Sequence, residues 1–549
     1  MNKMIFVLAK LKSLSAYLII MSVCLLLYWP TLNYGLTYLD DNVWVVEYQW
    51  FFQQIQNSIH ILTKPDFISG IFYRPLLNLS FMLNANILGG KLLSYRLFNI
   101  GFHVFNGFLV YRVLVGFQYR RELALYWSLI FCAHPALVSA VAWIPGRTDS
   151  LLAFFCLSSF LFFMKYTGTR NIFYSIMHLI CFICALGVKE TAIVLPVVCG
   201  VYYYLLVKPG FLFRSMHRLI AAWFFLMFFW LNVHQIVLID SPQVNLEMMK
   251  LSLVSNSPAI LSYLGKAFLP FNLSVLPDLK DLTLVYGGIT VLFMGLFCFR
   301  GFKRRYRYIF FGFFWFLIFL VPSLILSFIK HEYRLYLPLF GFILCAQELF
   351  VATWFDTRRY IVRVMMVSVL IVFCFLTLIH SHHYHNQFSF WENAVQTSPH
   401  SPLAHRNLGA MYYLEGKFKE AKNLFRQALV INPKEKMANM NLGLIAMQNH
   451  NFRQAEMHFL REARINPYYD SVYLNWGILS YQTGRWRKAE SLWLRTVELN
   501  PNNVKAYKNL LVLYLNTGNK NASEQLIWMM QDKGIPISND HLLAFQRLM

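Results

Sequence analysis

Long apolar runs fill most of this 549-residue chain and constrain its fold more than any other feature. A helix that crosses a membrane needs about 20 largely apolar residues, and runs of that kind recur up to residue 380. Only 14% of the residues are charged, against about 25% in soluble domains. We therefore predict an all-α, polytopic membrane domain. Its expected spans, about eleven in number, are residues 14–31, 97–117, 123–141, 149–165, 172–188, 191–207, 219–238, 283–299, 308–329, 335–352 and 361–380.

The basic residues predict how these spans are oriented. Lys and Arg gather in alternate loops, as at Arg120 and Arg121, and the loops between them hold only isolated basic residues. Because basic loops stay in the cytoplasm, the N-terminus is expected there and the C-terminal domain on the outer side. The predicted location is the inner (plasma) membrane, with a periplasmic C-terminal domain, or a lumenal one in a eukaryote. The formal charge of +23 is scattered among the apolar runs, which argues against nucleic-acid binding.

All nine cysteines fall inside the apolar runs. Cys181 and Cys184 form a CxxC pair, but no second pair or histidine set accompanies it, as a zinc site would require. We therefore predict thiols buried in the membrane and no metal site. No cofactor is predicted, although a divalent metal ion is left open.

From about residue 388 the composition becomes that of a soluble domain and the sequence becomes periodic. Glycine recurs every 34 residues at Gly409, Gly443 and Gly477, and proline and alanine series keep the same interval. This period is typical of the tetratricopeptide repeat, a pair of helices. Small residues let the two helices pack closely, and proline ends the second helix. We predict an α-solenoid with a partial repeat at each end.

The change in composition divides the chain into two predicted domains. Residues 1–385 are expected to form the membrane domain and residues 386–549 the repeat domain. The expected units of the repeat domain are a half-repeat at 388–399, repeats at 402–435, 436–469 and 470–503, and a degraded capping repeat at 504–536.

Two adjacent carboxylates, Asp40 and Asp41, lie just beyond the first span, on the predicted outer side. One interpretation is that they sit in a solvated loop or cap the helix that follows. The other is that one carboxylate is a general base for a hydroxyl group. Since adjacent side chains rarely point the same way, we expect one to face a substrate and the other to brace it or to coordinate a metal ion.

Further ionisable residues lie in the other predicted outer loops. Arg74 could open a helix or extend its charge to the membrane surface. Arg147 and Asp149 stand where a span begins, so capping is an alternative to function. Lys189 and Glu190 lie between two apolar runs, where ionisable residues are functional by default.

The segment "KHEYRLYLP" (330–338) has the same character, with Arg334 placed to bind a phosphate and Glu332 placed to balance its charge. Taken together, the outer loops offer an acid to activate a hydroxyl and several cations to hold a phosphate. This combination suits the displacement of a phosphate leaving group.

The order of these motifs resembles one family over nearly the whole chain. It is similar to the transmembrane, tetratricopeptide-containing O-mannosyltransferases of the GT-C glycosyltransferase superfamily. The short repeat array and compact outer loops favour a bacterial relative. The motifs that carry the resemblance are Asp40-Asp41, Tyr73-Arg74-Pro75, His134-Pro135, Gly146-Arg147-x-Asp149, Lys189-Glu190 and Glu332-Tyr333-Arg334-Leu335-Tyr336-Leu337-Pro338.

The resemblance implies an inverting membrane glycosyltransferase. It would move a sugar from a polyprenyl-phosphate carrier to a Ser or Thr hydroxyl of an exported protein, which the repeats select. Asp40 or Asp41 is then the expected catalytic carboxylate, which serves the acceptor hydroxyl. The expected phosphate contacts are Arg147, Lys189, Arg334 and Arg74, and the expected supporting residues are Tyr73, His134, Asp149, Glu190, Glu332 and Tyr336.

Two alternatives stay open. The acceptor could be a lipid or an envelope glycan rather than a protein. The chain could also be a non-catalytic membrane scaffold whose repeats recruit partners, in which case the acidic pair needs no cations around it.

Overall fold

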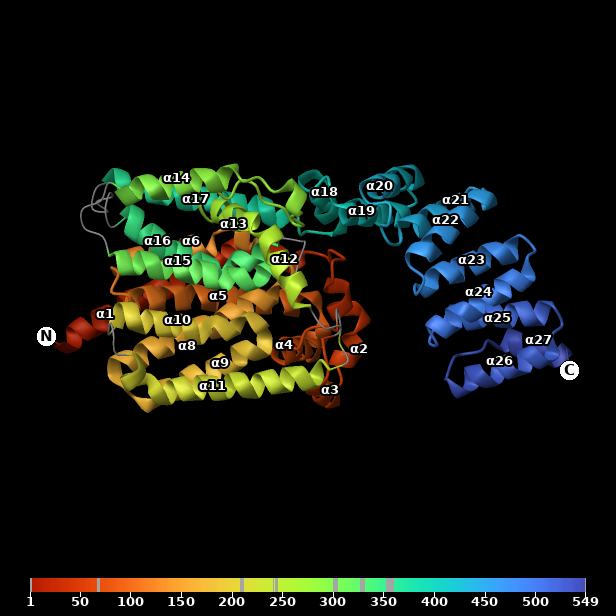
Figure 1. Ribbon diagram of the computed structural model, residues 1–549, viewed down its shortest axis with the longest axis horizontal. Coiled ribbons are helices and arrows are strands. Elements are labelled where there is room, and N and C mark those ends of the chain that lie inside the picture. The colour runs from red at the N-terminus through yellow and green to blue at the C-terminus, as the bar shows by residue number, and fades with distance from the viewer. Residues whose placement is uncertain are drawn as a thin grey trace. The chain divides into compact units, whose positions relative to one another are not determined.

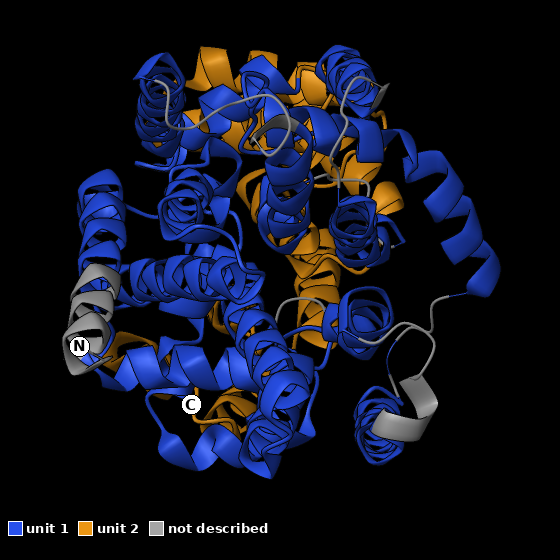
Figure 2. Ribbon diagram, turned by 90° about the vertical axis from the view of Figure 1, so that its left-hand side faces the viewer, with its two compact units in different colours: residues 1–398 blue, residues 399–549 orange. Residues whose placement is uncertain are grey.

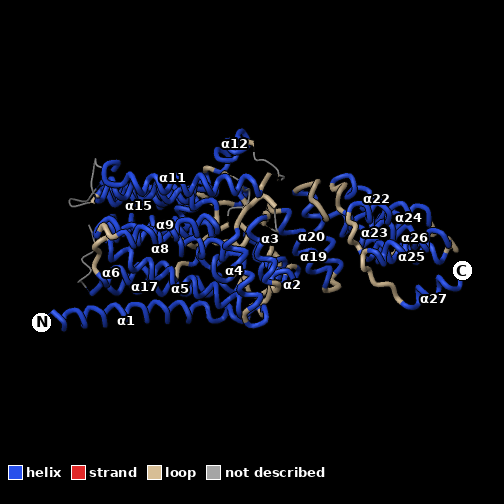
Figure 3. The backbone as a smooth tube through the Cα atoms, turned by 90° about the horizontal axis from the view of Figure 1, so that it is seen from below, coloured by secondary structure: helices blue, strands red, loops and turns tan. Residues whose placement is uncertain are grey.

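A computed structural model describes residues 2–66, 70–207, 212–239, 241, 245–299, 305–325, 331–351 and 360–548. The chain divides into two compact units, unit 1 (Met1–Ser398) and unit 2 (Pro399–Met549), coloured separately in Figure 2. The described residues of both units form helices and no strands (Figure 3), which confirms the all-α prediction. The topology prediction also depends on Lys208, Arg300, Lys303, Arg304, Arg358 and Arg359 in the basic loops, and these residues lie outside the described residues.

Unit 1 is a bundle of apolar helices. Within the described residues, seven helical segments are long and apolar enough to cross a membrane, and a bent pair of helices makes up to eight. The long segments are Leu14–Asn33 (from α1, Asn2–Tyr28), Leu92–Gly116 (α5), Ile144–Thr169 (with α8, Arg147–Thr169), Glu190–Val207 (with α10, Leu195–Tyr202), Met216–Val237 (from α11, Leu212–Val237), Tyr306–Leu324 (with α15, Tyr306–Leu320) and Tyr360–His382 (α17).

The other predicted spans are shorter or broken helices. The bent pair joins α6 (Arg121–Cys132) to the segment Pro135–Ala142, which contains α7 (Val138–Ala142), at an angle of 53°. Proline explains this break, because it lacks an N–H and cannot continue a helix from the preceding turn. The remaining three are α9 (Ile172–Val188), α14 (Val285–Phe299) and α16 (Tyr336–Ala346) with the π-helical turn Gln347–Val351.

The long helices of unit 1 run side by side (Figures 1 and 3), and α8 packs against both α5 and α9. Helices α15 and α16 approach closely at Gly312 and Gly341, where a Cβ on Gly312 would lie 2.7 Å from the Gly341 carbonyl oxygen. Small residues allow this approach between membrane helices. Trp315 is completely buried beside them.

Short helices and loops gather at the end of unit 1 that lies away from the N-terminus (Figure 1). Backbone hydrogen bonds join them across the sequence: the Gly35 N–H donates to the His385 carbonyl at 2.8 Å. The acidic loop after α1 belongs to this end. Its short helices are α2 (Gln49–Phe52), α3 (Ser58–Thr63), α4 (Pro75–Asn86), α12 (Leu246–Asn256), α13 (Pro258–Phe268) and α18 (Gln387–Thr397).

Unit 2 consists of successive helix pairs and a final helix. The second helices of the pairs begin 34 residues apart, at Phe418, Phe452, Trp486 and Lys520. Phe459 shows why glycine recurs: a Cβ on Gly443 would lie 2.7 Å from its ring. The helices are α19 (Pro402–Leu414), α20 (Phe418–Ile431), α21 (Ala438–Gln448), α22 (Phe452–Ile465), α23 (Asp470–Gln482), α24 (Trp486–Leu499), α25 (Val504–Asn516), α26 (Lys520–Asp532) and α27 (Asn539–Leu548).

The predicted half-repeat at 388–399 corresponds to α18, which belongs to unit 1. Asn393 of this helix accepts the Val275 N–H at 3.3 Å, and Ser398 accepts the Asp278 N–H at 3.3 Å. The helix therefore contributes to the end of unit 1 that holds the acidic loop.

Candidate functional site

The acidic loop after α1 is held by two tryptophans from distant parts of unit 1. Trp391 donates its indole N–H to the Thr37 carbonyl at 3.0 Å, and Trp143 donates to the Leu39 carbonyl at 2.9 Å. The backbone just before Asp40 is therefore fixed, and Asp40 itself has a left-handed conformation with φ 66°. Such a conformation is unusual for a residue with a side chain. The predicted carboxylates thus sit on an ordered loop.

The two carboxylates have different surroundings. Asp41 is 1% exposed, and its Oδ2 accepts the Thr37 N–H at 2.7 Å and the Thr37 hydroxyl at 3.0 Å. Burial raises the pKa of Asp41, while the bonds from Thr37 and the nearby charge of Arg96 oppose that rise. Asp40 is only partly buried. Asp41 therefore braces the loop, and Asp40 is the more accessible of the two carboxylates.

Asp40 has the acid strength expected of a proton acceptor. Burial raises the pKa of Asp40 to about 6, and the negative charges of Asp41 and Asp66 raise it as well. A carboxylate that titrates close to neutral pH can take a proton and release it again at the working pH. At pH 7 most of the Asp40 population is ionised and ready to accept a proton.

Arg74, at the start of α4, is paired with Glu190. Its Nε and Nη2 donate to Oε2 of Glu190 at 3.3 and 3.0 Å, and its guanidinium lies 3.8 Å from the Phe72 ring centre. Burial lowers the pKa of Arg74, but the nearby acids, Glu190 above all, outweigh burial and the net shift is upward. The other oxygen of Glu190 is buried without a hydrogen-bond partner among the described residues. Glu190 therefore keeps an acceptor free at this place.

Lys189 and Asp149 form a second pair beside the first. The Lys189 ammonium lies 2.9 and 2.8 Å from the two Asp149 oxygens, and both side chains are largely buried. Burial lowers the pKa of Lys189, whereas Asp149 raises it. The structure thus brings Arg74, Lys189 and both of their neighbouring acids to one place.

Tyr333 lies at the centre of these groups. The Lys189 ammonium lies 5.6 Å from the Tyr333 ring centre. Burial raises the pKa of Tyr333 to about 12, and side chains from its own segment and from three others act on it electrostatically. These neighbours are Arg334, Asp149, Arg74 and Asp40.

Arg334 differs from the other two cations because the acceptor of its hydrogen bond is neutral. Its Nη1 donates to the Ser323 carbonyl at 2.9 Å. Together with Asp149 and Lys189 it lines a small hollow closed by apolar side chains such as Phe319. Arg334 can therefore meet an anion without giving up a carboxylate, whereas Lys189 and Arg74 would have to share theirs.

Three stacked rings connect this hollow to the acidic loop. The rings of His331 and Tyr333 lie 4.8 Å apart at 17°, and the Trp143 ring lies 5.9 and 5.8 Å from them. Burial lowers the pKa of His331 to about 3, with Arg334 and Lys189 adding to the effect. Both cations therefore act on the His331 ring, at the edge of the stack.

Arg147 does not face this site. It is completely buried, and its Nε donates to Asn99 Oδ1 at 2.8 Å while its Nη2 donates to the Tyr95 carbonyl at 2.9 Å. Its Nη1 bonds to Ser80 and Asn84. All three nitrogens are thus occupied by neutral acceptors. The geometry favours a structural role, which differs from the expectation that Arg147 contacts a donor phosphate.

Four predicted residues remain, and each is held by hydrogen bonds or ion pairs of its own. Tyr73 donates its hydroxyl to the Leu62 carbonyl at 2.8 Å, and His134 contacts the Ala267 carbonyl at 3.2 Å. The Tyr336 hydroxyl lies 2.7 Å from His103 Nδ1. Glu332 is 1% exposed and is paired with Lys266 at 2.7 Å and with His380 at 3.2 Å. These groups position backbone and side chains, and all four are buried.

A row of buried polar side chains on α5 was not predicted from the sequence. Arg96, Asn99, His103 and Asn106 are each at most 1% exposed, and their spacing of three and four residues places them on one face of a helix. Arg96 donates to the Gly35 carbonyl at 2.6 Å and so supports the acidic loop. The predicted span began at residue 97 and left Arg96 out, although its spacing with the next three polar residues would have revealed the row.

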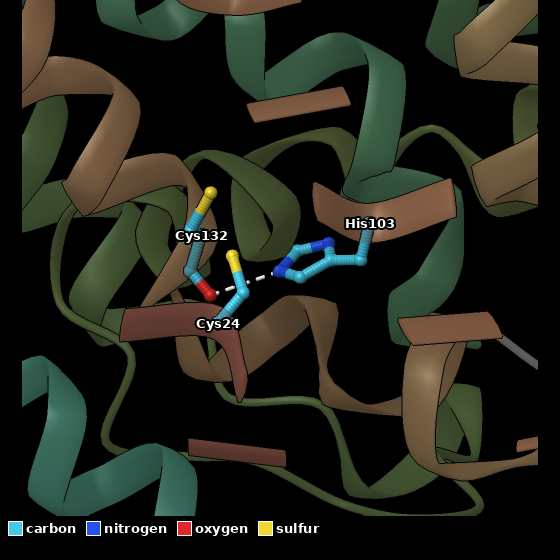
Figure 4. A group of neighbouring side chains, drawn as sticks. All are labelled: Cys24, His103 and Cys132. Atoms are coloured by element: carbon cyan, nitrogen blue, oxygen red, sulfur yellow. Dashed lines mark hydrogen bonds between the residues drawn. The ribbon is translucent and has the colours of Figure 1, made fainter. Parts of the chain in front are cut away.

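Cys24, His103 and Cys132 form a buried cluster that could suggest a metal (Figure 4). Their ligand atoms lie within 4.8 Å of one another. However, the Nε2 atom of His103 lies 2.9 Å from the Cys132 carbonyl, and its Nδ1 is bonded to Tyr336. Because neither ring nitrogen has a lone pair to spare in this arrangement, we assign the cluster to packing.

Comparison with known proteins gives partial matches. A family model for the tetratricopeptide repeat matches residues 402–435, the same segment in which the first repeat was expected. The chain is 32% identical over 133 residues to protein O-mannosyl-transferase TMTC3 of Homo sapiens, which covers 24% of this chain and 14% of that protein. It is 38% identical over 104 residues to TMTC2 of Homo sapiens, covering 18% and 12%. The chain is therefore similar to these transferases, although the match spans only about one seventh of their length.

Among solved structures, Pseudomonas aeruginosa pilF has a TM-score of 0.27 and 21% identity over 29% of this chain and 72% of that chain. YrrB, described as a TPR protein with an unusual peptide-binding site, has a TM-score of 0.24 and 20% identity over 35% of this chain and 93% of that chain. The apolar helices and the named relatives together describe a multi-pass membrane protein with tetratricopeptide repeats.

Proposed function

We propose that unit 1 is a glycosyltransferase of the GT-C type, which moves a sugar from a polyprenyl-phosphate-linked donor to a Ser or Thr hydroxyl of an exported protein. The observation that carries this proposal is the arrangement around Tyr333. A reachable carboxylate that titrates near neutral pH, Asp40, lies in the same electrostatic neighbourhood as Arg334 and Arg74. The named relatives are protein O-mannosyl-transferases, which supports protein as the acceptor.

The reaction needs only groups of these kinds. Asp40 accepts the proton of the acceptor hydroxyl as its oxygen forms a bond to the anomeric carbon. The bond from that carbon to the phosphate oxygen breaks at the same time, and the electron pair leaves with the polyprenyl phosphate. A single displacement of this kind inverts the anomeric configuration. Arg334 stabilises the charge of the leaving phosphate, with Lys189 and Arg74 at the border of its site.

We propose an orientation on the same grounds. The acidic loop lies at the end of unit 1 away from the N-terminus (Figure 1), so a cytoplasmic N-terminus would put the chemistry on the outer side. There the donor phosphate and an exported protein can meet. We further propose that the repeats of unit 2 select the acceptor protein and lie on that same outer side, periplasmic or lumenal.

The test is glycopeptide mass spectrometry on cells that carry the intact gene, a deletion, or single variants expressed at equal level. Asp40→Asn keeps the shape of the side chain and removes the base, so the yield of a hexose-type adduct on exported Ser/Thr peptides should fall by about 10²–10⁴-fold. Glu122→Gln, an exposed carboxylate at the start of α6, is the matched control and should keep full yield.

An adduct that disappears in the deletion and in Asp40→Asn, but not in Glu122→Gln, supports the proposal. If Asp40→Asn modifies proteins as well as the intact chain does, Asp40 is not the base. If the deletion changes a lipid or envelope glycan instead, the acceptor assignment is wrong while the class of chemistry stands. If the deletion changes no glycan at all, a scaffold role takes its place.

A further inference from the structure

Unit 2 contains a polar hollow between neighbouring repeats. Helices α20 and α22, the second helices of two successive repeats, form its sides, and α21 forms its floor. Its volume is about 140 Å³. The residues that line it are Lys422, Arg426, Leu442, Ile445, Ala446, Asn449, Asn451, Gln454 and His458. They include two cations, a histidine and three amides, and none of them is a carboxylate.

The cations of this hollow are not neutralised by the protein. Within the described part of unit 2, neither Lys422 nor Arg426 forms an ion pair or a hydrogen bond. Some other exposed cations of the repeats are paired, as Lys488 and Arg485 are with Glu456. Lys422 and Arg426 are four residues apart, so both lie on one face of α20.

The opposite side of the hollow adds a third nitrogen group. The Nδ1 atom of His458 lies 3.1 Å from the amide oxygen of Asn439, which leaves Nε2 without a partner among the described residues. Burial lowers the pKa of His458 to about 4, and Arg461, Arg426 and Lys422 contribute. A histidine whose charged form is suppressed by three cations marks a region of positive potential.

We propose that this hollow binds a phosphate-type oxyanion, held by Lys422 and Arg426, with the Nε2 atom of His458 placed to accept a hydrogen bond from a phosphate hydroxyl. A guanidinium suits two oxygens of such a group at once, and the ammonium supplies a point charge for a third. The volume admits a tetrahedral anion with some water. Because the hollow lies in unit 2, it does not depend on the transferase proposed for unit 1.

The shared chemistry is the phosphate group, which a free ion or a phosphate monoester could supply. The experiment uses the full chain in lipid nanodiscs and follows the ³¹P resonance of inorganic phosphate at constant ionic strength. The intact chain should broaden this resonance saturably. The test variant is Lys422→Ala/Arg426→Ala, in which one half-buried and one exposed side chain are removed. Its affinity for phosphate should fall by about tenfold or more for each charge-assisted hydrogen bond removed.

The control removes the same charge elsewhere in unit 2. Lys419→Ala/Arg453→Ala changes two exposed residues outside the hollow and should bind phosphate as the intact chain does. Displacement by glycerol phosphate would support a monoester as the ligand, and its failure to displace would support the free ion. Equal loss in both double variants, absence of saturable broadening in the intact chain, or equally strong competition by acetate would overturn the proposal.

Discussion

Unit 1 and unit 2 each contain a Lys–Glu ion pair, and the two pairs differ sharply in burial. In unit 1, Lys266 and Glu332 pair at 2.7 Å with side chains only 7% and 1% exposed. In unit 2, Lys488 and Glu456 pair with side chains 38% and 26% exposed. A buried charge is tolerated only with a partner, because desolvation costs several kcal/mol per ion. Exposed pairs contribute about 0–1 kcal/mol.

The contrast shows where a charged residue carries information. In unit 1 a buried ionisable residue either belongs to a functional site or supports the fold, and the two roles have to be distinguished. Arg147 and Arg334 show how: the first has neutral partners on every nitrogen and no exposure, and the second lines a hollow. In unit 2 many exposed cations have no ion-pair partner among the described residues, and Lys422 and Arg426 differ from them because they line a polar hollow together.

The strongest effect should come from disrupting the buried pair of unit 1. Lys266→Met leaves Glu332 with the Ser274 N–H and His380 as its partners, and removal of one partner of a buried ion pair costs about 3–5 kcal/mol of unfolding free energy. Burial raises the pKa of Glu332, but Lys266 and His380 together outweigh it and the net shift is downward. Without Lys266 burial dominates, so the folded-state pKa rises above the unfolded value.

The sign of the pH effect follows from that shift. Protonated Glu332 is tolerated better inside the protein, so the variant should recover stability as the pH falls and lose it as the pH rises. Thermal unfolding in detergent between pH 5 and pH 8 measures both effects. A variant as stable as the intact chain across that range would contradict the argument.

The next effect concerns packing in unit 2. Gly443→Ala places a Cβ 2.7–3.1 Å from the ring atoms of Phe459, and overpacking of this kind costs about 1–3 kcal/mol. Gly101→Ala on α5 is the control in unit 1, since a Cβ there meets nothing within 4 Å. Chemical denaturation of the full chain, followed by helical circular dichroism, should show a loss for Gly443→Ala alone.

A smaller effect is expected at the acidic loop. Asp66→Asn removes one of the negative charges that raise the pKa of Asp40, while the amide oxygen can still accept the Gly70 N–H. The pKa of Asp40 should therefore fall by less than about one unit. The acidic limb of a transfer-rate profile, expected near pH 6 in the intact chain, should move to lower pH. If the acidic limb stays at the same pH, Asp40 is not the group whose titration the limb reports.

The weakest effect is expected at the exposed pair of unit 2. Lys488→Met should change the unfolding free energy by less than about 1 kcal/mol. Arg485 still pairs with Glu456 at 2.7 Å in this variant, and water screens the exposed charge of Glu456. The same denaturation measurement, repeated in high salt, should bring the variant and the intact chain together. A loss as large as that of Lys266→Met would erase the contrast between the two units.

Much of the architecture could be predicted from the sequence because it depends on local pattern. Apolar runs predict membrane helices wherever they occur, since a backbone in lipid must satisfy its own hydrogen bonds. The 34-residue period predicted the helix pairs because each repeat packs only on its neighbours. The bend between Cys132 and Pro135 breaks one predicted span into two helical segments, and proline in the sequence already explains it.

The acidic pair, the cations and their expected gathering outside the apolar spans followed from the sequence alone, through the order of motifs and apolar runs. Which of these groups can meet a substrate depends on the folded arrangement. Asp41 braces the loop because Thr37 bonds to it and Arg96 lies near it. The geometry favours a structural role for Arg147 because five neutral acceptor atoms surround its guanidinium. Burial and hydrogen-bond partners come from residues far away in the chain, so no local pattern can reveal whether a charged side chain supports a site or faces one.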